Sequence, residues 1–244
     1  MTAKSAALRP IETTSLPERV TIELRRAILS GRLAPGETFS LREIAAELDV
    51  SFIPVREAMR NLEAEGLVIT RPGKSARVAP LDLDDLHAIY RLRRTLEPEI
   101  ARRACRLLHD AELDRLEQTA AGFGDEQRGM NVIYEDHHTF HAALLAPATT
   151  VWDQRILMTL WRASERYIRI GFGRLDMNPS EHHRREQAHE HLVAGFRTRD
   201  PEVAAGAIYA HLARNEKIAV QSLADTPSAA SAPTSNRDGR PEAV

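Results

Sequence analysis

The long stretch from Asp82 to Leu223 constrains the fold most. Glycine and proline are rare inside its helical apolar periods, and the stretch lacks the alternating pattern that is typical of strands. The breaks GFGD, AP, GFGRLDMNP and RDP divide it into expected helices near residues 82–108, 110–125, 130–146, 149–172, 179–199 and 201–222. The sequence therefore predicts an all-α antiparallel helical bundle over residues 82–223.

The preceding residues have a different organisation. LPERVTIELRRAILSG has a helical apolar face and ends at Gly31, and the short SLREIAAELDV begins with Ser40 and Glu43 spaced as a capping box. A third helix is expected over SFIPVREAMRNLEAEG, and the runs LVITR and ARVAP around PGKS indicate a β-hairpin. The fold class is therefore mainly α, with a winged helix-turn-helix unit over residues 16–81 in front of the bundle.

A helix-turn-helix places the N-terminal end of its last helix in the major groove of DNA. That end carries Ser51, Phe52, Ile53 and Arg56, while Arg42 lies at the start of the preceding helix. The tip of the wing, Gly73 and Lys74, is within reach of an adjacent groove. We expect double-stranded DNA as a partner. The alternative is that these arginines are solvated positions on ordinary helices.

Composition narrows the class of protein. The chain is 43% hydrophobic, and it has neither an apolar run as long as a membrane span nor the apolar core of a signal peptide. A single cysteine, Cys105, excludes an internal disulfide and zinc sites built on several thiolates. We therefore expect a cytoplasmic protein without a membrane partner. Residues 1–15 are expected to be flexible, and the small, polar, proline-containing residues 224–244 to be disordered.

Histidines cluster in the second half of the chain. Eight of the ten lie between residues 137 and 211, and His137 and His141 are spaced to place both rings on one helix face, where they can bind one metal ion. A metalloprotease motif requires glutamate where His138 stands, so that chemistry is excluded. No nucleophile elbow or phosphate-binding glycine loop is present. The alternative is a polar, histidine-rich helix surface.

Residues 16–81 resemble the N-terminal domain of the GntR superfamily of bacterial transcription regulators, and the pieces GRLAPGE, VREA and LEAEGLV carry the likeness. The resemblance implies that Arg42, Ser51, Arg56 and Gly73 occupy DNA-contact positions. Phe52 and Ile53 replace a common arginine and threonine of that family. An apolar pair can contact thymine methyl groups, so the operator sequence is expected to differ from that of typical relatives.

Residues 82–222 resemble the all-helical FCD subgroup, named for the C-terminal domain of the fatty-acid regulator. The opening pattern is matched from Arg93 to Glu97, and HHTFH is similar to the Asp-x-x-Phe-His of metal-binding members, with His137 in the Asp position. A later motif places histidines 11 residues before and after an aspartate, as His189 and His211 flank Asp200. The implied ligands of a divalent metal, zinc or nickel, are His137, His141, His189 and His211.

The same resemblance assigns the remaining polar residues. It leaves four histidines as surface residues: His138, His182, His183 and His191. His138 or Asp136 is a candidate to hydrogen-bond to a metal ligand and orient it. Arg93 is the expected second anchor for the carboxylate of an effector. Arg166 and Arg169 are expected to be solvated rather than to face the pocket.

The residue patterns and the two resemblances together predict a homodimeric, ligand-responsive transcription regulator rather than an enzyme. It would bind a palindromic operator, act as a repressor, and sense a small organic acid in a metal-assisted pocket. Two alternatives remain open. One is a DNA-binding protein whose metal is structural or is itself the signal, and the other is a helical metalloenzyme.

Overall fold

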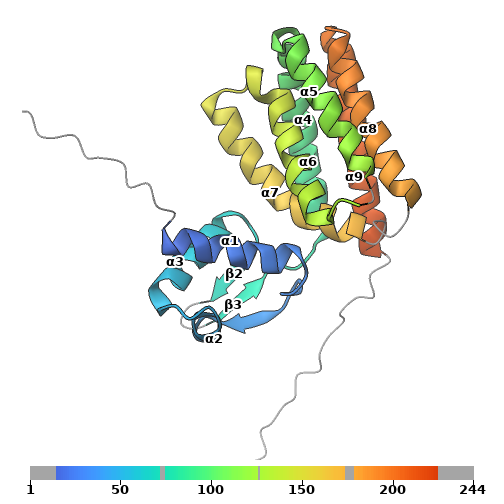
Figure 1. Cartoon of the computed structure of the whole chain (residues 1–244). Coiled ribbons are helices and arrows are strands. Elements are labelled where there is room, and N and C mark those ends of the chain that lie inside the picture. The colour runs from blue at the N-terminus through green and yellow to red at the C-terminus, as the bar shows by residue number, and fades with distance from the viewer. Residues whose placement is uncertain (1–14, 72–74, 126, 174–178, 225–244) are drawn as a thin grey trace, which may run out of the picture.

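The computed structural model describes residues 15–71, 75–125, 127–173 and 179–224. They form a small N-terminal unit and a larger helical bundle, joined by a short connection around residues 79–82 (Figure 1). The mainly α fold class is confirmed. The expected flexible N-terminus and disordered tail fall almost entirely outside the described residues, as do Gly73 and Lys74.

Three helices and a three-stranded antiparallel sheet make up the N-terminal unit: α1 (Leu16–Leu29), β1 (Thr38–Ser40), α2 (Leu41–Glu47), α3 (Phe52–Ala64), β2 (Val68–Arg71) and β3 (Ser75–Val78). The strand order is β1-β3-β2, so β3 lies in the middle. The expected hairpin is β2–β3. Strand β1 was not predicted because it is only three residues long and only its central residue, Phe39, is buried.

Local sequence signals set the ends of these helices. Ser15 accepts a hydrogen bond from the amide of Glu18, and Ser40 accepts one from the amide of Arg42. Gly31 and Gly66 follow α1 and α3 with φ of 76° and 70°, in the left-handed region that favours glycine. The third helix thus begins and ends where its sequence predicts.

Six α-helices form the bundle: α4 (Leu83–Leu107), α5 (Asp110–Ala121), α6 (Met130–Leu145), α7 (Val151–Gly173), α8 (Pro179–Arg197) and α9 (Pro201–Ala224). The expected helix over residues 110–125 is wrong at its end, because the chain tightens into the 3₁₀ turn Gly122–Gly124 and buries Phe123 there. Among the helices the structure describes, none combines the length and apolar character that a bilayer span requires.

Helix α7 is the bundle helix that lies beside α1 (Figure 1). Arg166 of α7 donates to the carbonyl of Ala79 at 3.1 Å and to the carboxylate of Asp85 at 2.8 Å. The hydroxyl of Tyr167 donates to the carbonyl of Asp82 at 3.1 Å. The expectation that Arg166 is solvated is therefore wrong: the side chain is buried and holds the connection between the two units.

A second contact joins α7 to the end of α3. Arg25 of α1 binds the carboxylate of Glu65 through two hydrogen bonds of 2.9 and 2.6 Å, and Arg162 of α7 donates to the same carboxylate at 2.9 Å. Glu65 is the C-cap residue of α3 and is buried. One carboxylate thus connects all three helices across the boundary between the units.

Candidate metal centre and nucleic-acid interface

The structure brings together the four histidines that the resemblance singled out. His137 and His141 come from α6, His189 from α8 and His211 from α9, and one nitrogen of each ring lies within 4.8 Å of those of the others. His141, His189 and His211 are 4%, 2% and 6% exposed, and His137 is half-buried. Such a set of imidazoles matches the preferences of zinc, nickel and related ions.

Ring nitrogens at this site lack partners among the described residues. The Nδ1 atom of His189 lies 2.6 Å from the carbonyl oxygen of Arg185, so Nδ1 carries the proton and Nε2 keeps its lone pair. That Nε2 atom is buried and has no hydrogen bond among the described residues. The Nδ1 atoms of His141 and His211 also lack partners there, while their Nε2 atoms lie 3.3 Å from Nε2 of His137 and 3.0 Å from the amide nitrogen of Asn215. A buried lone pair without a donor, as on Nε2 of His189, is costly, and a bound cation would satisfy it. The donor set therefore fits a divalent metal.

Burial also keeps these rings neutral. Burial lowers the pKa of His189 to about 4. Burial, reinforced by the neighbouring histidines and Arg93, holds the pKa values of His137, His141 and His211 well below their usual range. Only a neutral imidazole can donate a lone pair to a metal ion, so the site is already in its ligating form at neutral pH.

Phe123 packs against the histidine cluster from the 3₁₀ turn after α5. Its ring centroid lies 4.6 Å from that of His189, 6.0 Å from that of His137 and 5.6 Å from that of Phe140. The side chain is fully buried. Phe123 therefore fixes ring orientations on two different helices. The sequence analysis did not predict a role for Phe123, because GFGD has the composition of a helix break. An aromatic residue between two glycines was the signal that could have indicated it.

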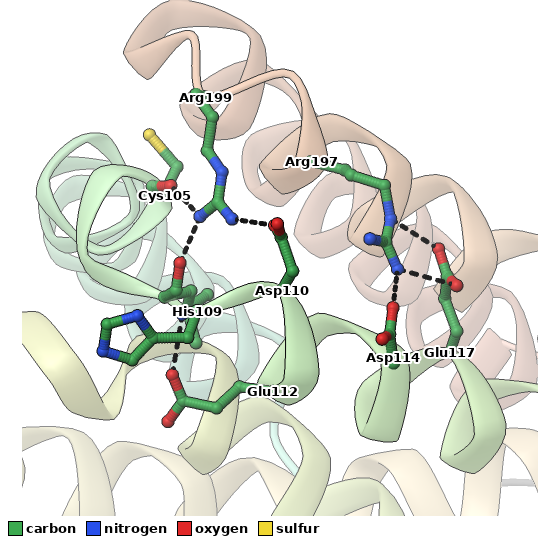
Figure 2. Close-up of polar contacts among 9 residues, drawn as sticks. Cys105, His109, Asp110, Glu112, Asp114, Glu117, Arg197 and Arg199 are labelled. Carbon is green, nitrogen blue, oxygen red and sulfur yellow. Dashed lines mark hydrogen bonds and ion pairs between the residues drawn. The ribbon is translucent and has the colours of Figure 1, made fainter.

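The turn between α8 and α9 is held by two arginines (Figure 2). Arg197 binds Asp114 and Glu117 of α5 at 2.8 and 2.9 Å. Arg199 donates to the carbonyl of Cys105, at 2.9 Å, and to that of Leu108, near the end of α4. This turn connects α8, which carries His189, with α9, which carries His211.

Arg93 lies beside the cluster but already has partners. Its Nε donates to Glu97 at 2.6 Å and its Nη1 donates to Ser164 at 3.0 Å, while the indole of Trp161 also donates to Glu97 at 2.9 Å. A cavity of about 30 Å³ separates this group from His137 and His141. A second cavity, of about 10 Å³, lies on the side of His189 and Arg214.

The other histidines do not all lie at the surface. His183 and His191 are exposed, but His182 is 6% exposed, so its predicted surface position is wrong. It lies near the start of α8, where the helix packs on the bundle. His138 is half-buried with its ring edge-on to Trp161 at 5.3 Å. Asp136 is bound by Arg128 rather than by any ring of the cluster.

The N-terminal end of α3 is open to solvent. Phe52 and Ile53 are 39% and 59% exposed, and Arg56 follows one turn later on the exposed face. Ser51 is the N-cap residue, but its side chain forms no capping hydrogen bond. Arg42 is exposed at the start of α2, and neither arginine forms an ion pair with any residue that the structure describes. These side chains are free to contact DNA.

A winged helix-turn-helix followed by an all-helical bundle is the architecture of a class of transcription regulators. Residues 16–78 match the family of bacterial regulatory proteins called the gntR family, and residues 88–214 match the FCD domain. The chain belongs to the GntR family, in its FCD-containing branch.

Similar proteins agree with this membership. BphR of Paraburkholderia xenovorans is 31% identical, over 64% of this chain and 67% of its own, and the Nta operon transcriptional regulator of Aminobacter aminovorans is 30% identical, over 77% and 86%. The repressor RspR of Escherichia coli is 29% identical, over 53% of this chain and only 59% of its own. Among solved structures, Escherichia coli McbR/YncC has a TM-score of 0.73 at 22% identity, covering 86% and 100%.

The function follows at the level of the family. The protein is a transcription regulator of the GntR/FCD type, and members of this family bind DNA and are not enzymes. FCD domains often bind a metal ion, and the histidine cluster occupies that domain here. The metalloenzyme alternative is thereby set aside.

Proposed function

We propose that this protein is a cytoplasmic, metal-dependent repressor that binds a palindromic operator as a homodimer and responds to a small carboxylate. The observation that carries the proposal is the cluster of four histidines whose ring nitrogens lie within 4.8 Å of one another, three of which keep a buried nitrogen without a hydrogen bond among the described residues. Residues 16–81 would contact DNA, and residues 82–223 would hold zinc or nickel and the effector.

His137, His141, His189 and His211 would hold the ion between three helices. The bound ion would supply a Lewis acid for the carboxylate of an effector. The protein would contribute neutral imidazole rings and the ring of Phe123, which packs against them. It would also bury the site, and ionic contacts are stronger where water is excluded. Arg93, buried next to the cluster, favours an anion in this part of the bundle even while it is paired with Glu97.

On DNA, Arg56 and Arg42 would bind phosphate or guanine, and Phe52 and Ile53 would contact thymine methyl groups. A homodimer would present two α3 helices to the two halves of the operator. Gly73 and Lys74 remain candidates for the adjacent groove, although they lie outside the described residues. RspR of Escherichia coli is a repressor, and its similarity to this chain supports repression as the direction of control.

A second candidate function is a sensor of the metal itself, or a protein with a structural metal. The cavities beside the cluster, about 30 and 10 Å³, hold at most a water or two, so an organic acid requires side chains to move. Under this alternative the ion alone changes operator affinity. Organic acids then have no effect on it.

Thermal unfolding of the full-length protein distinguishes the two. Zinc, nickel, chelator and a panel of small carboxylates are tested alone and together, with His141→Ala as the test variant and the exposed His191→Ala as its control. A ligand at 100 times its dissociation constant adds about 2.7 kcal/mol to the free energy of unfolding. The proposal expects one acid to raise the midpoint only when metal is bound. If metal without any acid changes both the unfolding midpoint and the affinity for the operator, the result supports the metal sensor instead.

Operator binding is tested separately by fluorescence anisotropy. Arg56→Ala is expected to weaken operator binding by about 1–3 kcal/mol, with metal and acid binding unchanged. Arg19→Ala, at an exposed position near the start of α1, is the matched control. Loss of operator binding and ligand binding together would contradict a division of labour between the two units.

A further inference from the structure

We propose that Arg214 is the second anchor of the effector site, and that the effector class is a small dicarboxylate rather than a monocarboxylate. This inference rests on the proposed function, because it places the first carboxylate at the histidine cluster. Arg214 is a different residue from Arg93, the anchor expected from the sequence, and lies on a different helix.

Arg214 lies on α9, three residues after His211, and is half-buried. Its side chain lines the small cavity that is also lined by His137, His189 and Asn215. Within the part of the chain that the structure describes, it forms no hydrogen bond or ion pair. A guanidinium held in a cavity wall without a counterion is costly, and a carboxylate is its best-matched partner.

Arg93 lines one cavity and the buried Arg185 lines the other beside Arg214, and neither is without a partner. Arg93 binds Glu97 and Ser164, and Arg169 binds Glu165 at 2.8 Å. Glu181, the carboxylate that attracts Arg214, forms its ion pair with Arg184. Arg214 therefore shares the attraction of Glu181 with Arg184 and forms no ion pair of its own among the described residues.

The electrostatic setting of Arg214 agrees with this assignment. Burial, with the nearby Arg184 and Arg185, lowers the pKa of Arg214 against the opposing attraction of Glu181. An anion placed beside Arg214 would offset both the burial and the like charges. The positive charges around Arg214 therefore favour binding of a carboxylate at this position.

Charge balance selects the class of effector. Four neutral imidazoles contribute no negative charge, so a divalent ion held by them keeps a charge of +2, and Arg214 adds +1. A monocarboxylate would neutralise one of these charges, whereas a dicarboxylate would neutralise two and place one group at each end of the site. Unbalanced buried charge is strongly unfavourable, so the dianion is preferred.

The acid would enter by displacing a small apolar cluster. Tyr134 and Ile168 pack together with Ile218 and line both cavities, so they form the wall between the two. This cluster is separate from the main core of the bundle, which can stay packed when the wall moves. The small size of the two cavities is therefore compatible with a chain of a few carbons.

Isothermal titration calorimetry of the metal-loaded, full-length protein tests the inference. The probes are unbranched dicarboxylates of three to six carbons, each paired with its monoamide, which has the same length but one charge. Wild-type protein is expected to bind one dicarboxylate at least about tenfold more tightly than its monoamide, because a charge-assisted hydrogen bond is lost in the amide. Arg214→Gln should abolish that preference while keeping the bound metal and the affinity for the monoamide.

Lys217→Gln is the matched control, since Lys217 is an exposed cation on the same helix three residues further on. Equal affinities for dicarboxylate and monoamide, or an unchanged preference in Arg214→Gln, would overturn the inference and leave the metal-carboxylate proposal standing. Failure of every carboxylate to bind metal-loaded protein would overturn both. A preference that Arg93→Gln, and not Arg214→Gln, removes would move the second anchor to Arg93 and overturn the assignment of Arg214.

Discussion

Acidification of the metal-free protein should destabilise it well before its carboxylates titrate. The four clustered histidines are neutral in the folded protein, with the pKa of His189 lowered to about 4 by burial, whereas in the unfolded chain they take up protons near pH 6.5. The unfolded state therefore binds more protons below pH 6.5. Stability that is present above pH 6.5 is lost as the pH falls towards 4.

The magnitude follows from the same shifts. At pH 5, each histidine that stays neutral in the folded state lowers the free energy of unfolding by about 2 kcal/mol. Four such rings would give about 8 kcal/mol, which is comparable with the whole stability of a typical domain, about 5–15 kcal/mol. The metal-free bundle is therefore expected to open, at least locally around the cluster, between pH 6.5 and pH 5.

Urea unfolding of chelated protein at steps from pH 7.5 to pH 5.5 measures the effect. His189→Asn removes one titrating ring and should reduce the loss over this interval by roughly 1 kcal/mol. His183→Asn, at an exposed position on the same helix, should leave it unchanged. A free energy of unfolding that stays flat from pH 7.5 to pH 5.5, or an equal loss in wild type and His189→Asn, would refute the argument.

Two further predictions concern the support of the site and its link to the DNA-binding unit. Phe123→Leu should weaken the binding of zinc or nickel, because the Phe123 ring packs on His137 and His189. Competition with a chelator measures this affinity. Phe196→Leu is the control, because Phe196 is equally buried and its loss should lower stability without changing the affinity for metal. Glu65→Gln should lower the free energy of unfolding by about 1–3 kcal/mol, because Arg25 and Arg162 lose their shared carboxylate. Urea titration measures this change. An unchanged free energy of unfolding would show that these ion pairs contribute little to stability.

The helices were predictable because their signals are local. Apolar spacing and a terminal glycine decide α1 and α3 within a few residues of chain, and α1 also has a serine cap. Strand β1 and the 3₁₀ turn at Phe123 escaped prediction for the opposite reason. Each is three residues long and is determined by a distant partner: β3 for the strand, and the histidine rings for Phe123.

The site divides in the same way. The spacing of His137 and His141 on one helix is visible in the sequence, whereas His189 and His211 could be chosen among eight clustered histidines only through the resemblance. Burial of His182 and Arg166 could not be inferred, because it depends on which side of α7 and α8 packs against the rest of the chain. That Arg214 lines a cavity beside the histidines and forms no ion pair with a described residue is a feature that only the three-dimensional arrangement shows.

Helix α7 offers a physical route from the candidate effector site to DNA. Ser164 and Ile168, one turn apart, line the cavities beside the histidines, while Arg162 and Arg166, also one turn apart, bind Glu65 and the carbonyl of Ala79 on the other side. Ile168 and both arginines belong to one helix, so any shift of α7 that follows displacement of the Ile168 side chain would reach both arginines. Coupling between sites is typically about 1–3 kcal/mol, which a few charged hydrogen bonds of this kind can supply.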